Sequence, residues 1–308
     1  MISKKILIMG GGGYIGKYLF YSNKKDNKIY LFDQKKEKIK SKKKVTFIRG
    51  NVHKKRSLSK IPNVDIVFFL IGLTGGAKSL EIKNLKKYLR YNSDSILSFL
   101  NIVKKKKIKK IIFTSTEHVH GDKFGKIEDA ERVEVFPKNY YGLSKLLAEK
   151  MLYSFYKKNR INIDILRIPR VIALNKSSFL HTMVKSAVNR NKIYINDLNT
   201  KFNFIFIDDL ISAMNLCSKK QSTGFRILNI FNNSKPENLS ALAFRIKKII
   251  NKKIKIYFLK KTQKNHNPKN PIISNKKTKK ILHWEPSLSN NEILKKIIKF
   301  YEFKNRSI

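Results

Sequence analysis

The chain is 308 residues long, and 42% of its residues are apolar and 29% are charged. A chain of this size and composition buries a full core with room for a second lobe, which excludes collagen and intrinsic disorder. Its longest apolar run, residues 66–71, is too short for a membrane helix, which needs about 20 residues. The single cysteine, Cys217, excludes an internal disulfide and a Cys-based metal site. We therefore expect a cytoplasmic protein without a metal ion or a membrane span.

Lysine dominates the charge, since 68 Lys and Arg against 21 Asp and Glu give a net charge of +47. Nucleic-acid binders usually concentrate such charge on one face or tail. Here the lysines are spread along the whole length, in short runs such as residues 104–107. We interpret the charge as solvated surface, with no specific nucleic-acid partner, and leave open whether a polyanion such as RNA or anionic lipid binds.

The first half of the chain alternates apolar, strand-like runs with segments of helical periodicity. Continuous apolar strands separated by helices predict a parallel sheet covered on both faces. The predicted fold class is therefore α/β, with a doubly wound parallel sheet of the Rossmann type. The expected strands are residues 5–9, 29–32, 45–49, 66–71, 111–115 and 163–167, and the expected helices are residues 15–21, 85–104 and 140–157.

After about residue 174 the pattern is mixed. Helices are expected at residues 179–189, 209–218, 239–250, 276–282 and 292–303, and strands at residues 204–207 and 225–230. We predict a first domain at residues 1–170, to which residues 202–233 return. Residues 171–201 and 234–308 are predicted to form a smaller mixed α/β lobe that binds the substrate.

Glycines follow the first strand at the start of the next helix, in the order GGGGYIG at residues 10–16. Gly10 permits the tight turn, Gly13 lets the backbone approach a pyrophosphate, and Gly16 allows the helix to pack closely. Asp33 ends the second strand, where a carboxylate accepts the ribose hydroxyls and repels a 2′-phosphate. This arrangement predicts a dinucleotide site for NAD rather than NADP.

A tyrosine and a lysine stand four residues apart in a segment of helical periodicity, at Tyr141 and Lys145. This spacing puts both side chains on one face of a helix. An ammonium group beside a phenol favours the phenolate, so together with the positive nicotinamide we expect a lowered pKa of Tyr141, which then serves as a base. Thr116, at the carboxyl end of a strand, would bridge the substrate oxygen and Tyr141. Tyr140 is the alternative register, but Ser144 follows it at the spacing where a lysine is needed.

Six short motifs occur in order along almost the whole chain: MGGGGYIG at 9–16, TSTEHVHG at 114–121, YGLSK at 141–145, LRIPR at 166–170, IDD at 207–209 and LHWEP at 282–286. They resemble the TGxxGxxG, SSxxxVYG, YxxxK, LRxxN, VxD and LGWxP motifs of the extended short-chain dehydrogenases/reductases. This NAD-dependent epimerase/dehydratase group acts mainly on nucleotide sugars. Met9 stands in place of the family's Thr.

The resemblance implies further contacts with NAD. Asn51 replaces the usual Asp near the adenine, and its carboxamide can still donate and accept there. Pro169 is expected near the nicotinamide. The full set of expected cofactor residues is Gly10, Gly13, Tyr14, Ile15, Gly16, Asp33, Asn51, Val52, Leu70, Gly72, Asn92, Tyr141, Lys145 and Pro169.

The predicted substrate lobe departs more from the family. Arg170 stands where Asn is usual, Phe202 where Arg is usual, and Lys264 where a phosphate-binding Arg is expected. Lysine binds phosphate as a point charge without the bidentate fork of arginine. The expected substrate contacts are Thr74, Thr116, Arg170, Lys201 and Lys264.

The two residues that directly follow Thr116 bear on the type of reaction. Family dehydratases place an Asp acid and a Glu base there, whereas this chain has Glu117 and His118. A carboxylate and an imidazole can share acid and base work, which would suit a dehydratase. We interpret both instead as polar residues behind the site, which favours epimerisation of a nucleotide sugar through a transient keto intermediate. The alternatives are a reductase or dehydrogenase of another sugar or small alcohol, and a protein that binds NAD without turnover and serves a structural or RNA-binding role. The family further implies a homodimer formed through the helices at residues 85–104 and 140–157.

Overall fold

The central sheet of the computed structural model contains seven parallel strands, in the order β12-β7-β5-β4-β1-β2-β3. The structure describes residues 3–35, 44–104, 106–122, 126–127, 129–197, 200–220, 223–250, 253–259 and 272–306. The strands are β1 (Lys5–Met9), β2 (Lys28–Asp33), β3 (Val45–Arg49), β4 (Ile66–Phe69), β5 (Lys110–Thr116), β7 (Asn162–Ile168) and β12 (Phe225–Asn229). Every strand predicted in the first half of the chain belongs to this sheet.

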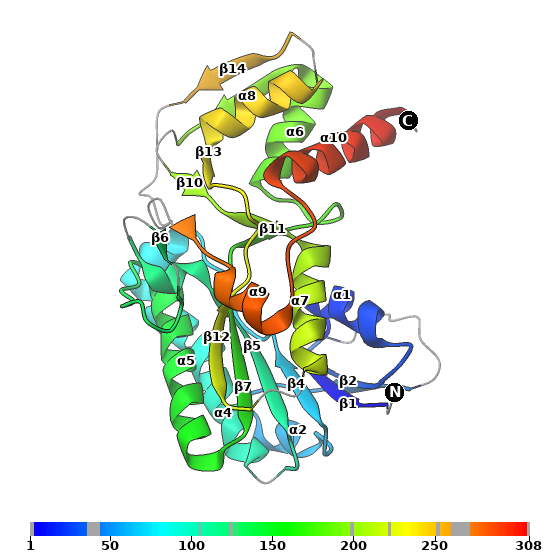
Figure 1. Ribbon diagram of the computed structural model, residues 1–308, viewed down its shortest axis with the longest axis vertical. Helices are drawn as coiled ribbons and strands as arrows, with labels where there is room; N and C mark the ends of the chain where they lie inside the picture. The colour runs from blue at the N-terminus through cyan, green and yellow to red at the C-terminus, as the bar shows by residue number, and fades with distance from the viewer. Residues whose placement is uncertain are drawn as a thin grey trace.

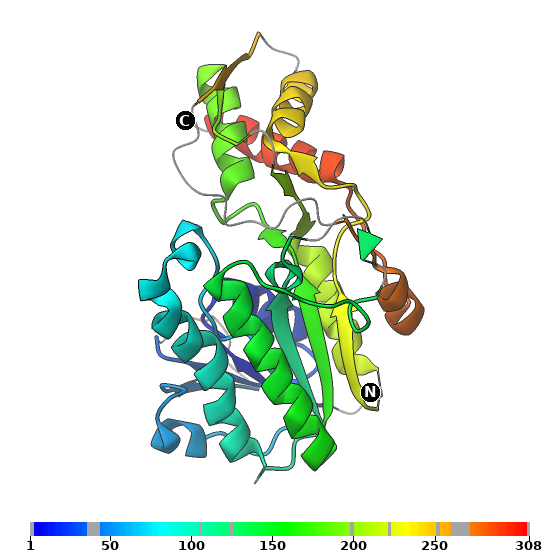
Figure 2. The same cartoon turned by 90° about the vertical axis from the view of Figure 1, so that its left-hand side faces the viewer.

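Helices cover both faces of the sheet, because successive side chains of each strand point to opposite sides. On β1, Ile6 and Ile8 belong to one hydrophobic cluster, together with side chains of α1 (Tyr14–Asn23) and α7 (Ile207–Lys219). Leu7 and Met9 belong to a second cluster on the other face. There the covering helices are α2 (Lys55–Ser59), α4 (Ser95–Val103) and α5 (Tyr140–Asn159), which face the viewer in Figure 2. The predicted doubly wound α/β class is confirmed.

The helix expected at residues 85–104 is interrupted in the structure. It consists of α3 (Leu85–Tyr88), a π-helical turn η3 (Leu89–Asp94) and α4. Such single π turns within a helix occur frequently at functional sites. Asn92, a predicted cofactor residue, lies in this turn and is fully buried.

A smaller lobe lies above the carboxyl ends of the strands (Figure 1). It contains α6 (Phe179–Arg190), α8 (Leu239–Ile250) and α10 (Asn290–Arg306), with the ribbon formed by β9 (Lys192–Ile195) and β14 (Lys255–Phe258). β8 (Arg170–Ile172) pairs in parallel with β11 (Phe204–Phe206) between the sheet and the lobe. The remaining elements are β6 (Lys126–Ile127) paired with β15 (Ile272–Ile273), β10 (Lys201–Phe202) paired with β13 (Glu237–Asn238), α9 (Lys276–Leu282), η1 (Ala77–Leu80), η2 (Ile82–Asn84) and η4 (Glu117–His120).

β12 is the edge strand beside β7. Residues 225–229, which belong to the stretch 202–233, therefore lie in the central sheet. The boundaries of the two units stay a prediction. The short elements were not predicted, because α2, β9 and β14 span only four or five residues each, too few to establish a period.

One carboxylate holds two cations on the face of the sheet that α1 and α7 cover. The Lys110 ammonium lies 2.7 Å from Asp164, and Arg226 donates two hydrogen bonds of 2.7 Å to the same carboxylate. Asp164 and Lys110 are almost inaccessible to water, and the Arg226 side chain is 13% exposed. Asp164 of β7 therefore balances charges contributed by its two neighbouring strands, β5 and β12.

We expect Asp164→Asn to lower the free energy of unfolding by about 3–5 kcal/mol, because it leaves Lys110 and Arg226 without their counter-charge. The matched control is Glu285→Gln, which breaks the exposed ion pair with Lys279 and should cost less than about 1 kcal/mol. Urea unfolding followed by circular dichroism measures both. Equal losses in the two variants would contradict this account.

Candidate active site

A cavity of about 610 Å³ lies between the carboxyl ends of the central strands and the small lobe. Open α/β sheets bind ligands at this edge. Its walls come from both units, since Thr116 ends β5 and Phe179 begins α6. The predicted site residues that line it are Tyr14, Ile15, Leu70, Gly72, Thr74, Thr116, Tyr141, Lys145, Pro169 and Arg170.

The glycine loop is folded tightly against the start of α1. Gly10 has a φ of +86°, a conformation that L side chains rarely adopt, and its N–H donates to the Phe32 carbonyl at 2.8 Å. A Cβ atom at Gly16 would overlap the carbonyl oxygen of Gly10, so the helix can approach the loop only without a side chain. Asp33 accepts a 3.0 Å hydrogen bond from Gly12 N. The carboxylate at the end of β2 therefore lies against the loop, as a dinucleotide site requires.

The entrance to α1 suits an anionic group. No acidic residue lies in its first turn, and no side chain caps its N-terminus, so its free N–H groups and helix dipole favour a phosphate. The Tyr14 hydroxyl is buried here and has no hydrogen-bond partner among the described residues. Burial raises the pKa of Tyr14, which keeps the hydroxyl a donor. The Lys176 ammonium lies 4.1 Å from the centre of the Tyr14 ring.

Asn92 joins the loop after β4 to the helix that carries the catalytic candidates. Its side-chain oxygen accepts from Leu73 N at 2.7 Å, and its amide donates to Ser144 Oγ at 2.8 Å. Asn92 does not line the cavity. It instead fixes the position of Gly72, which does, relative to α5.

The structure brings Thr116, Tyr141 and Lys145 together at the floor of the cavity. Thr116 and Tyr141 are hydrogen-bonded through their hydroxyls. The Tyr141 ring lies against the backbone of Gly75, where a Cβ atom would stand 2.6 Å from Cδ1 of the ring. All three predicted residues thus line one cavity, although the Lys145 ammonium contacts the Thr114 carbonyl. Gly75 supplies a contact that the sequence did not indicate.

The predicted lowering of the Tyr141 pKa includes the effect of a positive nicotinamide and stays a prediction. Burial raises the pKa of Tyr141 to about 12, although the hydrogen bond with Thr116 lowers it in part. Lys145 donates to the Thr114 carbonyl at 3.0 Å, and its ammonium lies 4.8 Å from the Phe113 ring centre. Burial also lowers the pKa of Lys145 to about 8. Desolvation is therefore the main cause of both shifts, and Lys145 is not among the groups that change the pKa of Tyr141.

Glu117 and Arg170 form a partly buried pair in the wall of the cavity. Arg170 Nη1 lies 3.4 Å from Glu117 Oε1, and Asn203 donates to the other carboxylate oxygen at 3.2 Å. The guanidinium lies 4.7 Å from the ring centre of Phe202, the residue that replaces the family's arginine. Burial raises the pKa of Glu117 to about 7, although Arg170 and Asn203 both oppose this. Glu117 is therefore a group that can change its charge near neutral pH.

His118 also lines the cavity. Its Nδ1 lies 2.8 Å from the Asn139 amide, while the Asn139 side-chain oxygen caps α5 by accepting from Gly142 N at 2.8 Å. The His118 ring packs edge-on against the Tyr141 ring, with centres 5.3 Å apart. Glu117 and His118 are thus part of the cavity wall rather than behind it. The signal that could have found them is their place directly after a strand that ends at the site.

Some predicted residues lie elsewhere. Asn51 accepts a hydrogen bond from His53 N. Val52 is buried in the hydrophobic cluster on the face of the sheet that α2, α4 and α5 cover. Lys201 is exposed and does not line the cavity, because side chains alternate along β10 and its neighbour Phe202 points inward. Lys264 lies outside the described residues. Sequence reasoning missed cavity residues on the strand ends, loops and lobe: Leu73, Gly75, Glu117, His118, Lys176, Phe179 and Phe202.

Two kinds of feature are absent from the described residues. No helix there is long and apolar enough to cross a membrane. No group of three or more His, Cys, Asp or Glu side chains in the same residues could hold a metal ion.

Known proteins share this architecture and its motifs. The model of the NAD dependent epimerase/dehydratase family matches residues 6–230. The chain belongs to this family. A Bacillus subtilis relative, described as the uncharacterized UDP-glucose epimerase YtcB, is 26% identical over 302 residues, covering 92% of this chain and 94% of the relative. A dTDP-D-glucose 4,6-dehydratase of Dictyostelium discoideum is 28% identical over 80% of this chain and 62% of its own length.

Solved structures share the fold. UDP-glucuronic acid 4-epimerase from Bacillus cereus, in complex with UDP-glucuronic acid and NAD, superposes with a TM-score of 0.83 at 22% identity, covering 97% of this chain and 99% of the other. A dTDP-glucose 4,6-dehydratase from Bacillus anthracis in complex with NAD gives a TM-score of 0.83 at 19% identity, covering 99% and 98%. Epimerases and dehydratases are thus both among the similar structures of this family member.

The raised pKa of Glu117 makes stability depend on pH. The folded protein holds this proton up to a pH of about 7, whereas the carboxyl has an ordinary pKa of 4.5, so the folded state loses stability as pH rises from 4.5 to 7. Relative to Glu117→Gln, the parent protein should therefore be less stable at pH 8 than at pH 5. Thermal unfolding at both pH values measures this, with Glu134→Gln as the control for the loss of one carboxylate. A difference between parent and Glu117→Gln that does not change with pH would contradict the buried proton.

Proposed function

We propose that this family member is an NAD-dependent epimerase of a nucleotide sugar. The observation that carries the proposal is the hydrogen-bonded Thr116–Tyr141 pair beside Lys145, in a cavity with walls from both lobes. A structural role alone requires no such set of a hydroxyl, a phenol and an amine at the mouth of a parallel sheet. The YtcB relative is described as a UDP-glucose epimerase, which supports the substrate class.

The residues present fit NAD. The loop at Gly10 and Gly16 has room only for glycine, and Asp33 lies beside it, where the adenosine ribose would bind. The partnerless Tyr14 hydroxyl and the N-terminus of α1 would hold the pyrophosphate. When bound, NAD would accept a hydride from the sugar carbon and return it to the opposite face.

Tyr141 would take the proton of the sugar hydroxyl and give it back after the keto intermediate has turned. Thr116 would orient that oxygen through the hydrogen bond it already makes with Tyr141. Because the pKa of Tyr141 is about 12 in the protein alone, the phenol needs a nearby positive charge to act as a base near neutral pH. Arg170 already lowers this pKa, and Lys145, one helical turn along α5, would add to the effect if its ammonium turned towards the phenol.

Arg170 and Lys176 would bind the anionic part of the substrate. Both line the cavity. The Arg170 guanidinium lies 4.7 Å from the Phe202 ring centre and would exchange its contact with Glu117 for a bidentate contact with a phosphate or a sugar carboxylate. Lys176 lies at the α1 entrance. UDP-glucuronic acid, the ligand of the B. cereus epimerase, carries both kinds of group.

Dehydration is the second candidate, because Glu117 lies in the cavity wall with a pKa of about 7. A carboxyl that is half protonated near neutral pH can donate a proton to a leaving hydroxyl. Its pairing with Arg170 and Asn203 favours the epimerase, since those contacts compete with the substrate for the same oxygens.

We expect the purified protein with NAD to convert one member of a panel of UDP-, dTDP- and GDP-hexoses and hexuronic acids into its 4-epimer, as followed by proton NMR. Tyr141→Phe should lower kcat by at least about a hundredfold, because it removes the base. Tyr140→Phe is the matched control, since this neighbouring ring does not line the cavity, and it should retain activity.

Three other results would each have a definite meaning. A 4-keto-6-deoxy product would replace the epimerase by the dehydratase. Release of one NADH per sugar oxidised would indicate a dehydrogenase. Binding of NAD without conversion of any sugar would favour the protein without turnover.

We further propose a homodimer formed by α4 and α5. These helices pack together on one face of the sheet, and each exposes a leucine, Leu97 at 45% and Leu147 at 37%. Charges at these positions would oppose the burial of an apolar surface. The double variant Leu97→Asp/Leu147→Asp should be a monomer by light scattering, whereas Phe303→Asp, at an exposed position of α10, should not change the mass. A dimer that survives the double variant would contradict this interface.

A further inference from the structure

A two-stranded ribbon at the outer end of the small lobe carries an aromatic pair. β14 pairs in parallel with β9, so that Lys255 lies opposite Lys192 and Tyr257 opposite Tyr194. Figure 1 shows β14 at the end of the lobe farthest from the seven-stranded sheet. We call the surface formed by Lys192, Tyr194, Lys255 and Tyr257 the tyrosine ribbon. None of its residues lines the active-site cavity.

The alternation along the two strands separates a core face from a solvent face. Ile193 and Ile195 are buried in the core of the lobe. Tyr194 and Tyr257 instead remain 46% and 37% exposed, and their rings stack with centres 5.2 Å apart and planes at 19°. The two tyrosines on adjacent strands therefore form an exposed stacked pair that is not part of the protein core.

The chain segments that lead to and form β14 carry only positive charge. Residues 239–250 and 253–259, which contain α8 and β14, include no Asp or Glu but five Lys and Arg. Lys192 and Lys255 are exposed, and neither makes an ion pair within the described part of the chain. The nearest acidic residue after β9, Asp197, is hydrogen-bonded to Thr200. The tyrosine ribbon thus combines two exposed lysines with a stacked pair of tyrosines.

We propose that the tyrosine ribbon binds single-stranded RNA. Proteins that hold single strands combine cationic groups for the phosphates with exposed aromatic rings on which bases stack. In the ribbon, a lysine precedes each tyrosine by two residues on the same face of its strand, so phosphate and base contacts lie side by side. Leu259, two residues after Tyr257, is also 53% exposed, and the vesicle experiment below tests whether it binds lipid. The proposal is independent of the activity at the cavity.

The experiment measures fluorescence anisotropy of a labelled 12-residue oligouridylate with the full-length protein at several salt concentrations. Tyr194→Ala/Tyr257→Ala should weaken binding about tenfold or more, because stacking of the bases is lost. Tyr194→Phe/Tyr257→Phe keeps both rings and should bind like the parent. Lys192→Gln/Lys255→Gln should reduce the slope of log K against log salt by about 1.4, as expected for the loss of two phosphate contacts on a single strand.

Tyr21→Ala is the matched control. Tyr21 is 49% exposed and has a lysine, Lys24, 4.6 Å from its ring centre, but no second tyrosine is stacked on it among the described residues. This variant should bind the oligonucleotide like the parent. Thermal unfolding of every variant shows whether the lobe remains folded.

Definite results would overturn the proposal. Unchanged binding by the Tyr194→Ala/Tyr257→Ala variant would mean that charge alone binds the strand. If heparin bound with the same affinity as the oligouridylate, and Lys192→Gln/Lys255→Gln weakened both equally, charge alone would again explain the binding. Binding of vesicles of phosphatidylserine and phosphatidylcholine that depends on both tyrosines, without binding of the oligonucleotide, would assign the surface to a membrane instead.

Discussion

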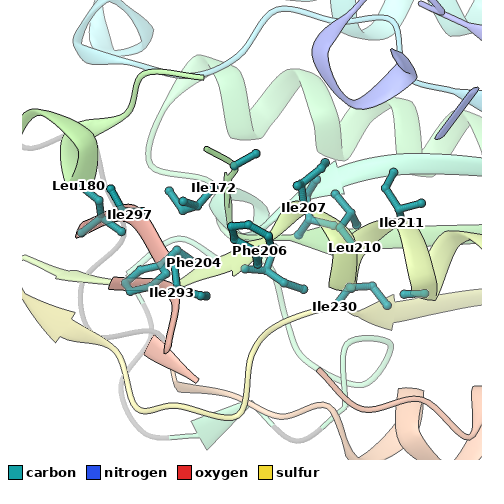
Figure 3. Packing of buried hydrophobic residues seen from close by; sticks show 14 of the residues in the cluster. Ile172, Leu180, Phe204, Phe206, Ile207, Leu210, Ile211, Ile230, Ile293 and Ile297 are labelled. Carbon is teal, nitrogen blue, oxygen red and sulfur yellow. The ribbon is translucent and has the colours of Figure 1, made fainter. Parts of the chain in front are cut away.

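A continuous hydrophobic core that runs from the sheet into the small lobe holds the two walls of the cavity in place. Figure 3 shows part of it, with Ile172 and Phe206 at the junction, Leu210 towards the sheet, and Leu180 and Ile293 towards the lobe. Because these side chains are fully or nearly fully buried, moving the lobe away would expose apolar surface at about 25 cal/mol per Å². The pairing of β8 with β11 lies within this core, so Arg170, the first residue of β8, is fixed relative to Tyr141.

A buried ion pair between β7 and α5 also holds parts of the cavity wall in place. Arg167 of β7 makes a forked contact with Glu149 of α5, with Nη2 at 2.7 Å and Nε at 3.1 Å, and Ser115 of β5 donates to the same carboxylate. Such a pair is costly to bury and therefore depends on complete hydrogen bonding. It ties the helix that carries Tyr141 and Lys145 to the strand that ends in Thr116.

Desolvation dominates the chemistry of the site. It raises the pKa of Tyr141 and Glu117 and lowers that of Lys145, so each group is pushed towards its neutral form. Tyr141 is therefore neutral near pH 7 in the protein alone. Under the proposed function, the positive nicotinamide ring of NAD would lower the pKa of Tyr141.

The sequence by itself determined the sheet, the glycine loop and the set Thr116, Tyr141 and Lys145, because each depends on a local period or a fixed spacing along one element. It did not determine the Glu117–Arg170 pair over Phe202, the position of Lys201 away from the cavity, or the stacked tyrosines of β9 and β14. These contacts join residues up to 63 positions apart in the sequence. Burial, strand alternation and the pairing of distant segments are decided by tertiary packing, and they set both the pKa values and the outer surface.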